Sequence, residues 1–302
     1  MAELEEKKIL QTSDTAAQIG EADTWLDKLK TLVRQNKLAA FSAVVIVVIA
    51  LMAVFAPHIA PYGYLEQDLV NRLQAPSAAH IMGTDELGRD VFSRLLYGAR
   101  ISLVVGIVPT VVAMTAGTIL GLIAGFYGGK IDYIIMRLGD IMLAFPALLL
   151  AMVFMYTLGG GLMNIFIALS VTEWASTARV VRAQTMSLKE TEYVEAARSI
   201  GVKKPKIMFR HILPNCIPSL IVLFTLNIPS AILSESSLSF LGVGVQLPDA
   251  SWGLMASWGK KYLFSEPWLP IAPCIAIMVV VLAFNFLGDG LRDVLDPYLK
   301  EQ

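Results

Sequence analysis

The sequence has few charged residues for its length. Only 16% of its 302 residues are Asp, Glu, Lys or Arg, whereas 56% are hydrophobic. Soluble domains carry about 25% charged residues. The mean hydropathy is correspondingly high, at +0.63. This composition excludes an ordinary soluble domain and predicts a chain that is largely embedded in a membrane.

Residues suited to metal or thiol chemistry are also scarce. The chain has two cysteines and three histidines, and the histidines lie far apart. It contains none of the motifs HExxH, CxxC or GxxxxGK[ST]. The sequence therefore predicts no metal, P-loop or other cofactor site within this chain. Cys216 and Cys274 lie in apolar stretches, and we expect both to be buried free thiols.

Long runs without charge predict the membrane-spanning helices, each of which takes roughly 20 apolar residues. Residues 141–172 are too many for one helix, and Gly159, Gly160 and Gly161 divide them. We expect an all-α integral membrane protein with six transmembrane helices, near residues 38–57, 101–129, 141–158, 162–182, 212–241 and 267–288. The first is interpreted as an uncleaved helix, because 37 residues precede it and it has full span length.

The distribution of Lys and Arg predicts the orientation of these helices. With the N-terminus inside, 18 of the 24 basic residues lie in inner segments and 6 in outer segments. Both termini should therefore face the cytoplasm. The predicted segments are a cytoplasmic tail with an interfacial helix near 25–36 (1–37), a first helix (38–57), an extracytoplasmic loop (58–100), a core of five helices (101–288) with a cytoplasmic loop (186–213), and a C-terminal cytoplasmic tail (289–302).

The cytoplasmic loop contains a charged segment, EYVEAARSIGVKKPKIMFRHILPN, between two apolar runs. Gly201 is typical of a residue just past a helix end, Pro205 suits the first turn of a second helix, and Pro214 limits its other end. The expected outward face combines Ala196 and Ala197 with larger apolar residues. A solvated loop and a membrane-surface helix are alternatives, but paired helices with small outward residues favour a docking site for a partner protein.

A second patterned segment, GTDELGRDVFSRLLYGARIS, begins at residue 83. Thr84 and Asp85 are candidates to cap a helix. An apolar stripe after them predicts an amphipathic helix at the outer interface, ahead of the second span.

These two segments resemble known motifs. The order EAA, Gly, Ile-Leu-Pro resembles the signature of inner-membrane subunits of binding-protein-dependent ABC importers. The GTD..GRD segment is similar to a motif in the peptide and nickel group of that family. The resemblance continues in SESSLSFLGVGVQLPDASWG and FNFLGDGLRDVLDPYLK and covers nearly the whole chain from about Arg34. The residues that carry it are Glu195, Ala196, Ala197, Gly201, Ile212, Leu213 and Pro214 in the first motif, and Gly83, Thr84, Asp85, Gly88, Arg89 and Asp90 in the second.

The resemblance implies a type I ABC importer permease fold and a subunit without enzymatic activity of its own. It implies that the first motif couples this chain to ATPase subunits, which use ATP and magnesium. The further partners would be a homologous second permease subunit, an extracytoplasmic peptide-binding protein and membrane lipid, with no nucleic acid. The implied location is the cytoplasmic membrane of a bacterium or archaeon. The implied function is import of oligopeptides or dipeptides by alternating access, with nickel or metal-chelate import as the alternative.

Ionisable and polar residues inside the spans are candidates for the translocation path, because they are costly there. The candidates are Glu173, Asn227 and Glu235, each with a purely structural role as the alternative. Gly117, Gly121 and Gly125 recur at every fourth position, which predicts a closely packed helix face.

Two other function classes are open to a chain of six helices. An intramembrane aspartyl protease needs two facing carboxylates, and Asp140 and Asp289 would have to supply them from span ends. A channel is the other alternative. Neither class needs the EAA motif, so both are disfavoured.

Overall fold

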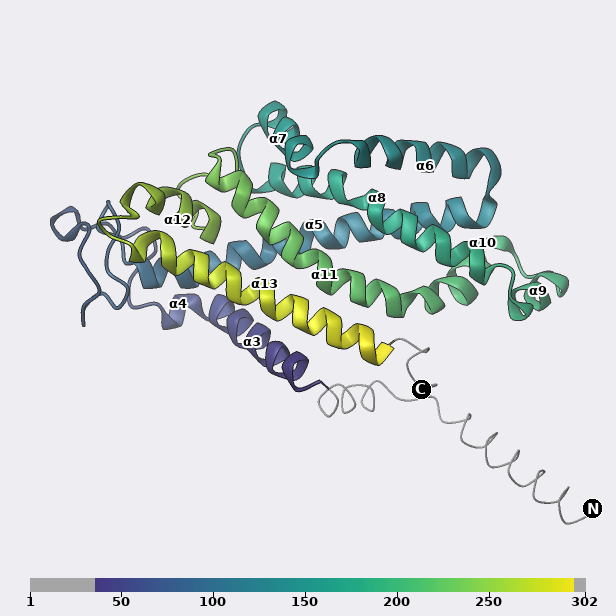
Figure 1. Cartoon of the computed structure of the whole chain (residues 1–302), viewed down its shortest axis with the longest axis horizontal. Coiled ribbons are helices and arrows are strands. Elements are labelled where there is room, and N and C mark those ends of the chain that lie inside the picture. Colours follow the sequence, from purple (N-terminus) through teal and green to yellow (C-terminus); the bar gives the residue numbers. More distant parts are fainter. Residues whose placement is uncertain (1–35, 296–302) are drawn as a thin grey trace, which may run out of the picture.

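The computed structural model describes residues 36–295, and this part of the chain is built from helices without strands (Figure 1). The predicted helix near 25–36 and the last residues of the predicted C-terminal tail lie outside it. The elements are α3 (Lys37–Val54), α4 (Ala56–Ile59), η1 (Leu69–Asn71), α5 (Val91–Tyr127), α6 (Gly129–Ala144), α7 (Ala147–Leu158), α8 (Leu162–Leu188), α9 (Glu192–Ser199), α10 (Lys204–Ile207), η2 (Met208–Ile212), α11 (Leu213–Phe240), α12 (Trp252–Gly259), η3 (Lys260–Tyr262) and α13 (Trp268–Leu295).

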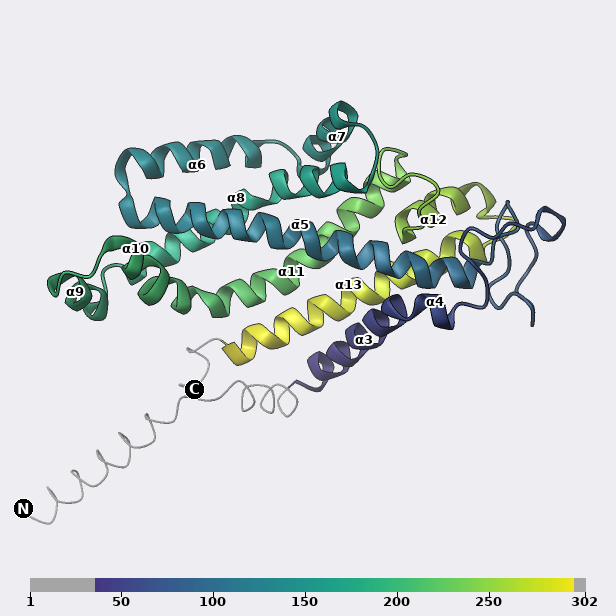
Figure 2. The same cartoon turned by 180° about the vertical axis from the view of Figure 1, so that it is seen from behind.

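The long helices pack side by side in an order that differs from their order in the chain (Figures 1 and 2). α3 packs along α13, α13 packs on α11, and α11 packs on α5. α8 follows on the other side of α5, with α6 beyond it. The short elements lie at the two ends: α9 and α10 extend past one end, and α12 covers the other.

Glycine is the reason that α5 and α8 approach so closely. A Cβ atom at Gly117 would lie 2.5 Å from the carbonyl oxygen of Trp174, and one at Gly121 equally close to that of Ala178. At Gly125 the corresponding distance, to the Arg182 oxygen, is 2.7 Å. The predicted close-packing face is confirmed, and its partner is α8.

Four helices are long and apolar enough to cross a membrane within residues 36–295: α3, α5, the continuous segment Lys204–Phe240, and α13. A fifth span results if α6 and α7 are taken as one. The predicted count of six is therefore not reproduced. α8 has 27 residues, about 40 Å at 1.5 Å per residue, and is long enough. It is not among the apolar spans, since it carries polar residues such as Glu173 and Arg179.

The third predicted span, 141–158, is wrong in its boundaries. Helix α6 already begins at Gly129 and ends at Ala144, and α7 begins at Ala147 after a bend of 91°. The bend lies at Phe145 and Pro146, because proline disfavours a helical conformation in the residue before it. The predicted break after residue 158 is confirmed: α7 ends there, and Gly159 and Gly161 take positive φ angles of 88° and 129°.

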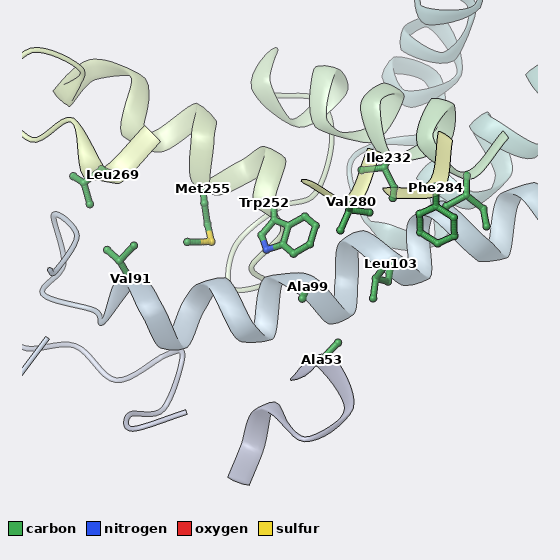
Figure 3. Packing of buried hydrophobic residues seen from close by; sticks show 11 residues of the cluster. Ala53, Val91, Ala99, Leu103, Ile232, Trp252, Met255, Leu269, Val280 and Phe284 are labelled. Atoms are coloured by element: carbon green, nitrogen blue, oxygen red, sulfur yellow. The ribbon is translucent and has the colours of Figure 1, made fainter. Parts of the chain in front are cut away.

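A cluster of apolar side chains closes the bundle at the α12 end (Figure 3). Trp252 of α12 is 2% exposed and packs against α5, where its Nε1–H donates to the Leu95 carbonyl at 2.9 Å. Elsewhere, Cys216 is buried as predicted, whereas Cys274 is exposed on the surface of this chain, so that prediction was half wrong. Large apolar side chains on α3 and α13 are exposed too, as expected where helices face lipid.

Candidate functional site

Helix α9 carries the EAA motif and projects beyond the ends of the long helices (Figures 1 and 2). It ends as the sequence predicts. Ile200 caps the helix and Gly201 follows with φ of +79°. The Gly201 N–H donates to the Arg198 carbonyl and the Val202 N–H to the Ala197 carbonyl, both at 3.0 Å. This is a Schellman motif, and its left-handed position favours glycine.

The second predicted short helix is not separate. α10 starts with Pro205 in its first turn, as predicted, but it leads through the π-helical turn η2 directly into α11. Pro214 therefore does not end a helix; it lies in the first turn of α11. A proline lacks an N–H and its ring crowds the carbonyl four residues earlier. The π turn, in which the Leu213 N–H reaches back to the Met208 carbonyl, lets the chain stay helical there.

The predicted outward face of this loop is only partly correct. Ala197, Ile207 and Met208 are buried, with Val194, in one cluster. This cluster also contains Leu122 of α5, Val181 of α8, and Ile212 and Cys216 near the start of α11. Tyr193, Ala196 and Ile200 remain exposed, and Ile200 is 81% exposed. α9 thus sits on the ends of three long helices and presents a second apolar edge outward.

At the other end of the molecule, the GTD..GRD segment forms a folded turn ahead of α5. The Asp85 carboxylate accepts hydrogen bonds from the backbone N–H of Leu87 (2.9 Å) and of Arg89 (3.0 Å). Gly83 and Gly88 both have φ of +72°. Gly88 packs on the Asp68 carbonyl so closely that a Cβ atom would collide with it. Thr84 is fully buried and accepts from the Gln74 N–H.

The start of α5 differs from the predicted cap and interfacial helix. α5 begins at Val91, and its N-cap is Asp90, which accepts from the Ser93 N–H at 2.7 Å. Thr84 and Asp85 lie upstream in the turn. The predicted amphipathic helix is the first part of α5, which continues without interruption to Tyr127. Asp90 also contacts His80 Nδ1 at 3.0 Å, and this contact ties the turn to the helix start.

Glu235 lies inside α11 and is completely buried. Its Oε1 accepts from the Ser239 and Ser251 hydroxyls, each at 2.7 Å. Ser251 is also the N-cap of α12, where it accepts from the Leu254 N–H. This geometry joins the end of α11 to the start of α12, and it favours the structural role over a place on an open path.

The other two candidates for the path differ from Glu235. Glu173 lies on α8 with Oε2 buried and without a hydrogen-bond partner among the described residues. Asn227 is half-buried on α11. The three side chains come from two helices, α8 and α11, and among residues 36–295 no hydrogen bond joins any two of them.

Two ion pairs that the sequence did not indicate join α6 and α8. The Arg182 guanidinium of α8 binds both carboxylate oxygens of Asp132 on α6, with Nη2 to Oδ2 at 2.6 Å. A second pair, Arg179 with Asp140 at 2.9 Å, joins the same helices but is about half exposed. Asp140 is thus ion-paired on α6, and α6 lies across the bundle from α13, which carries Asp289 (Figures 1 and 2). These aspartates do not form the facing pair of a protease.

Comparison with known proteins agrees with this architecture. A solved structure of the MetNI methionine ABC transporter in inward-facing conformations matches with a TM-score of 0.53. The match covers 67% of this chain and 96% of that one at 20% identity. It shows the type I ABC importer permease fold. Residues 32–76 match the family model for the N-terminal TM domain of oligopeptide transport permease C.

Sequence relatives match over nearly the full chain. The dipeptide transport system permease protein DppC of Alkalihalophilus pseudofirmus is 46% identical over 91% of this chain and 90% of its own length. The oligopeptide transport system permease protein OppC of Bacillus subtilis is 45% identical over 92% and 90%. The glutathione transport system permease protein GsiD of Pectobacterium atrosepticum is 43% identical over 91% and 92%. Residues 117–301 match the model for the inner membrane component of binding-protein-dependent transport systems, and the chain belongs to this family of integral inner-membrane permease subunits.

Proposed function

We propose that this chain is one of two homologous membrane subunits of an ABC importer for short peptides. Two ATPase subunits would bind it from the cytoplasm and an extracytoplasmic peptide-binding protein would deliver the cargo. ATP and magnesium would be used only in the ATPase subunits. The relatives named for dipeptides, oligopeptides and glutathione, itself a short peptide, support peptide cargo over a nickel or metal chelate.

The observation that carries the proposal is the position of α9. Its inner edge is buried against the ends of α5, α8 and α11, while its outer edge of Tyr193, Ala196 and Ile200 is exposed. A partner that binds the outer edge and shifts α9 would therefore move α5, α8 and α11 together. Of the predicted coupling residues, Glu195, Ala196 and Ala197 lie in α9 and Gly201 directly follows its cap, whereas Ile212, Leu213 and Pro214 lie where η2 continues into α11.

The proposed role of α9 also implies an orientation of the chain in the membrane, with α9 on the cytoplasmic side. The distribution of Lys and Arg supports a cytoplasmic position for α9 and for both termini. The loops around α4, η1, α12 and η3 would then face outward and receive the binding protein. Alternating access would arise when ATP binding in the partners shifts α9 and re-orients the helices attached to it.

Ala196→Trp tests the proposal. A bulky side chain on the outer edge should block close approach of an ATPase subunit without disturbing the buried cluster. We expect normal membrane insertion, loss of co-purification with the ATPase subunits, and loss of ATP-dependent uptake of labelled peptides by the reconstituted complex. The control is Arg198→Trp, on the opposite flank of α9, which should retain uptake. Normal uptake by the Ala196→Trp complex would contradict the proposal.

A further inference from the structure

The turn before α5 and the helix α12 enclose a small cavity. Its lining combines charged residues of the GTD..GRD segment with Trp258 and Tyr262, and with apolar side chains that include Val91, Met255 and Leu269. These three come from α5, α12 and α13 and are labelled in Figure 3. The cavity measures about 30 Å³. A cavity needs roughly 10–15 Å³ to hold one water, so this one fits about two oxygen-sized groups and no whole peptide.

Two buried guanidinium groups line this cavity and share a single carboxylate. Arg89 and Arg94 are 4% and 3% exposed. Asp85 contacts Arg89 Nε at 2.7 Å and Arg94 Nε at 3.6 Å. Its other oxygen is already occupied by two backbone N–H groups. Asp85 therefore has little capacity left for a further donor.

The second carboxylate of the lining is engaged elsewhere. Glu86 forms an ion pair with Lys261 and accepts a hydrogen bond from the Tyr262 hydroxyl at 3.0 Å. The hydrogen bond to Glu86 raises the pKa of Lys261 above its usual value, so Lys261 keeps its charge and remains an ion-pair partner for Glu86. Positive charge is thus in excess around the cavity, and the excess belongs to Arg89 and Arg94.

The Arg89 guanidinium has hydrogen-bond donors that no acceptor among the described residues occupies. Among the described residues, its guanidinium makes one hydrogen bond, from Nε to Asp85. The Nη atoms have no acceptor there, and they are not among the fully buried atoms that lack a partner, although the side chain as a whole is 4% exposed and lines the cavity. Arg94, by contrast, donates from Nη1 to the Tyr64 carbonyl at 2.9 Å. Trp258 covers the Arg89 guanidinium, with the ring centroid 5.8 Å from Cζ. Guanidinium donors that line a cavity without a protein acceptor are available to bind an anionic ligand.

We propose that this cavity binds a carboxylate group, held by the Nη donors of Arg89 between the turn and α12. Arginine binds carboxylates through two parallel hydrogen bonds, and the cavity has room for the two oxygens of one such group. The apolar walls suit a carboxylate on an apolar stem. It could be supplied by the C-terminus of a cargo peptide or by an acidic side chain of a docked protein; either source rests on the proposed function, but carboxylate binding itself does not.

Thermal unfolding of the purified full chain in detergent tests the site, with sodium acetate compared with sodium chloride at equal ionic strength. We expect acetate to raise the melting temperature of the wild type more than chloride does. Arg89→Lys, which keeps the charge but loses the two parallel donors, should weaken the acetate effect by about tenfold in apparent affinity. Arg89→Met should abolish it. Arg72→Met, at an exposed arginine in the same loop, should leave it unchanged.

The source of the carboxylate is distinguished by trialanine and its C-terminal amide. Stabilisation by trialanine but not by the amide would assign the site to the cargo. Stabilisation by acetate alone would assign it to an acidic side chain of a docked protein. If acetate has no more effect than chloride, or acts equally on wild type and Arg89→Lys, the site does not exist as proposed. The readout needs no transport, so its failure and a failure of the proposed function are separate results.

Discussion

Gly121 of α5 lies against the main chain of α8, where a Cβ atom would come within 2.5 Å of the Ala178 carbonyl oxygen. The contact is between backbones, so no side-chain rotation can relieve an added methyl group. Gly117 and Gly125 repeat it one turn to either side. The spacing of α5 and α8, and with it the position of α9 on their ends, depends on these three residues.

Gly121→Ala should therefore destabilise the protein. Overpacking of a close helix contact costs about 1–3 kcal/mol, and the two helices must separate to accept the methyl group. We expect a lower melting temperature for the purified variant in detergent. Gly63→Ala is the matched control, because a Cβ there would meet its nearest neighbour at 3.6 Å, an ordinary contact distance. Equal melting temperatures for the two variants would contradict the role assigned to Gly121.

Glu235 should matter as a hydrogen-bond acceptor. Glu235→Leu leaves the hydroxyls of Ser239 and Ser251 buried without their acceptor, at a cost of about 1–3 kcal/mol for each unsatisfied group. Glu235→Gln keeps an acceptor oxygen in place. We expect a marked loss of thermal stability for the Leu variant and near-normal uptake and stability for the Gln variant. If Gln abolishes uptake while stability is kept, the charge itself has a role in transport and the structural interpretation fails.

The two ion pairs between α6 and α8 should contribute unequally. Asp132 and Arg182 are 17% and 29% exposed and form two parallel bonds, whereas Asp140 and Arg179 are 49% and 57% exposed and form one. Double-mutant cycles with Asn and Gln replacements should give a coupling of about 1–3 kcal/mol for the first pair and at most about 1 kcal/mol for the exposed pair. Equal couplings would show that exposure does not decide their strength.

The sequence predicts the fold best at positions where the backbone conformation favours one residue type, such as glycine at a positive φ angle. Gly201 ends α9 and Gly159 ends α7 because both adopt positive φ angles. The four-residue spacing of Gly117, Gly121 and Gly125 predicts a close helix contact, although nothing in the spacing says that α8 is the partner.

Other features depend on tertiary contacts. Asp85 and Asp90 both precede α5 and both suit an N-cap; Asp90 takes that position, while Asp85 is held in the turn by Arg89 and backbone N–H groups. Alanine is small and only weakly apolar, so the sequence does not indicate that Ala197 faces the interior while Ala196 faces outward. The pairing of Glu235 with Ser251 joins residues 16 positions apart, across a loop whose path the sequence does not specify.

The union of α10, the π turn and α11 makes one helical rod of 37 residues, Lys204–Phe240. At 1.5 Å per residue such a rod is about 55 Å long, more than the thickness of the hydrocarbon core. A tilt of about 10° about one end would thus carry the other end through nearly 10 Å. The rod also contains Pro218 and Pro229 in its interior, and prolines are places where a helix bends. A displacement applied at the α9 end can therefore be divided among these joints, so that the two mouths of a passage need not open by the same amount or at the same moment.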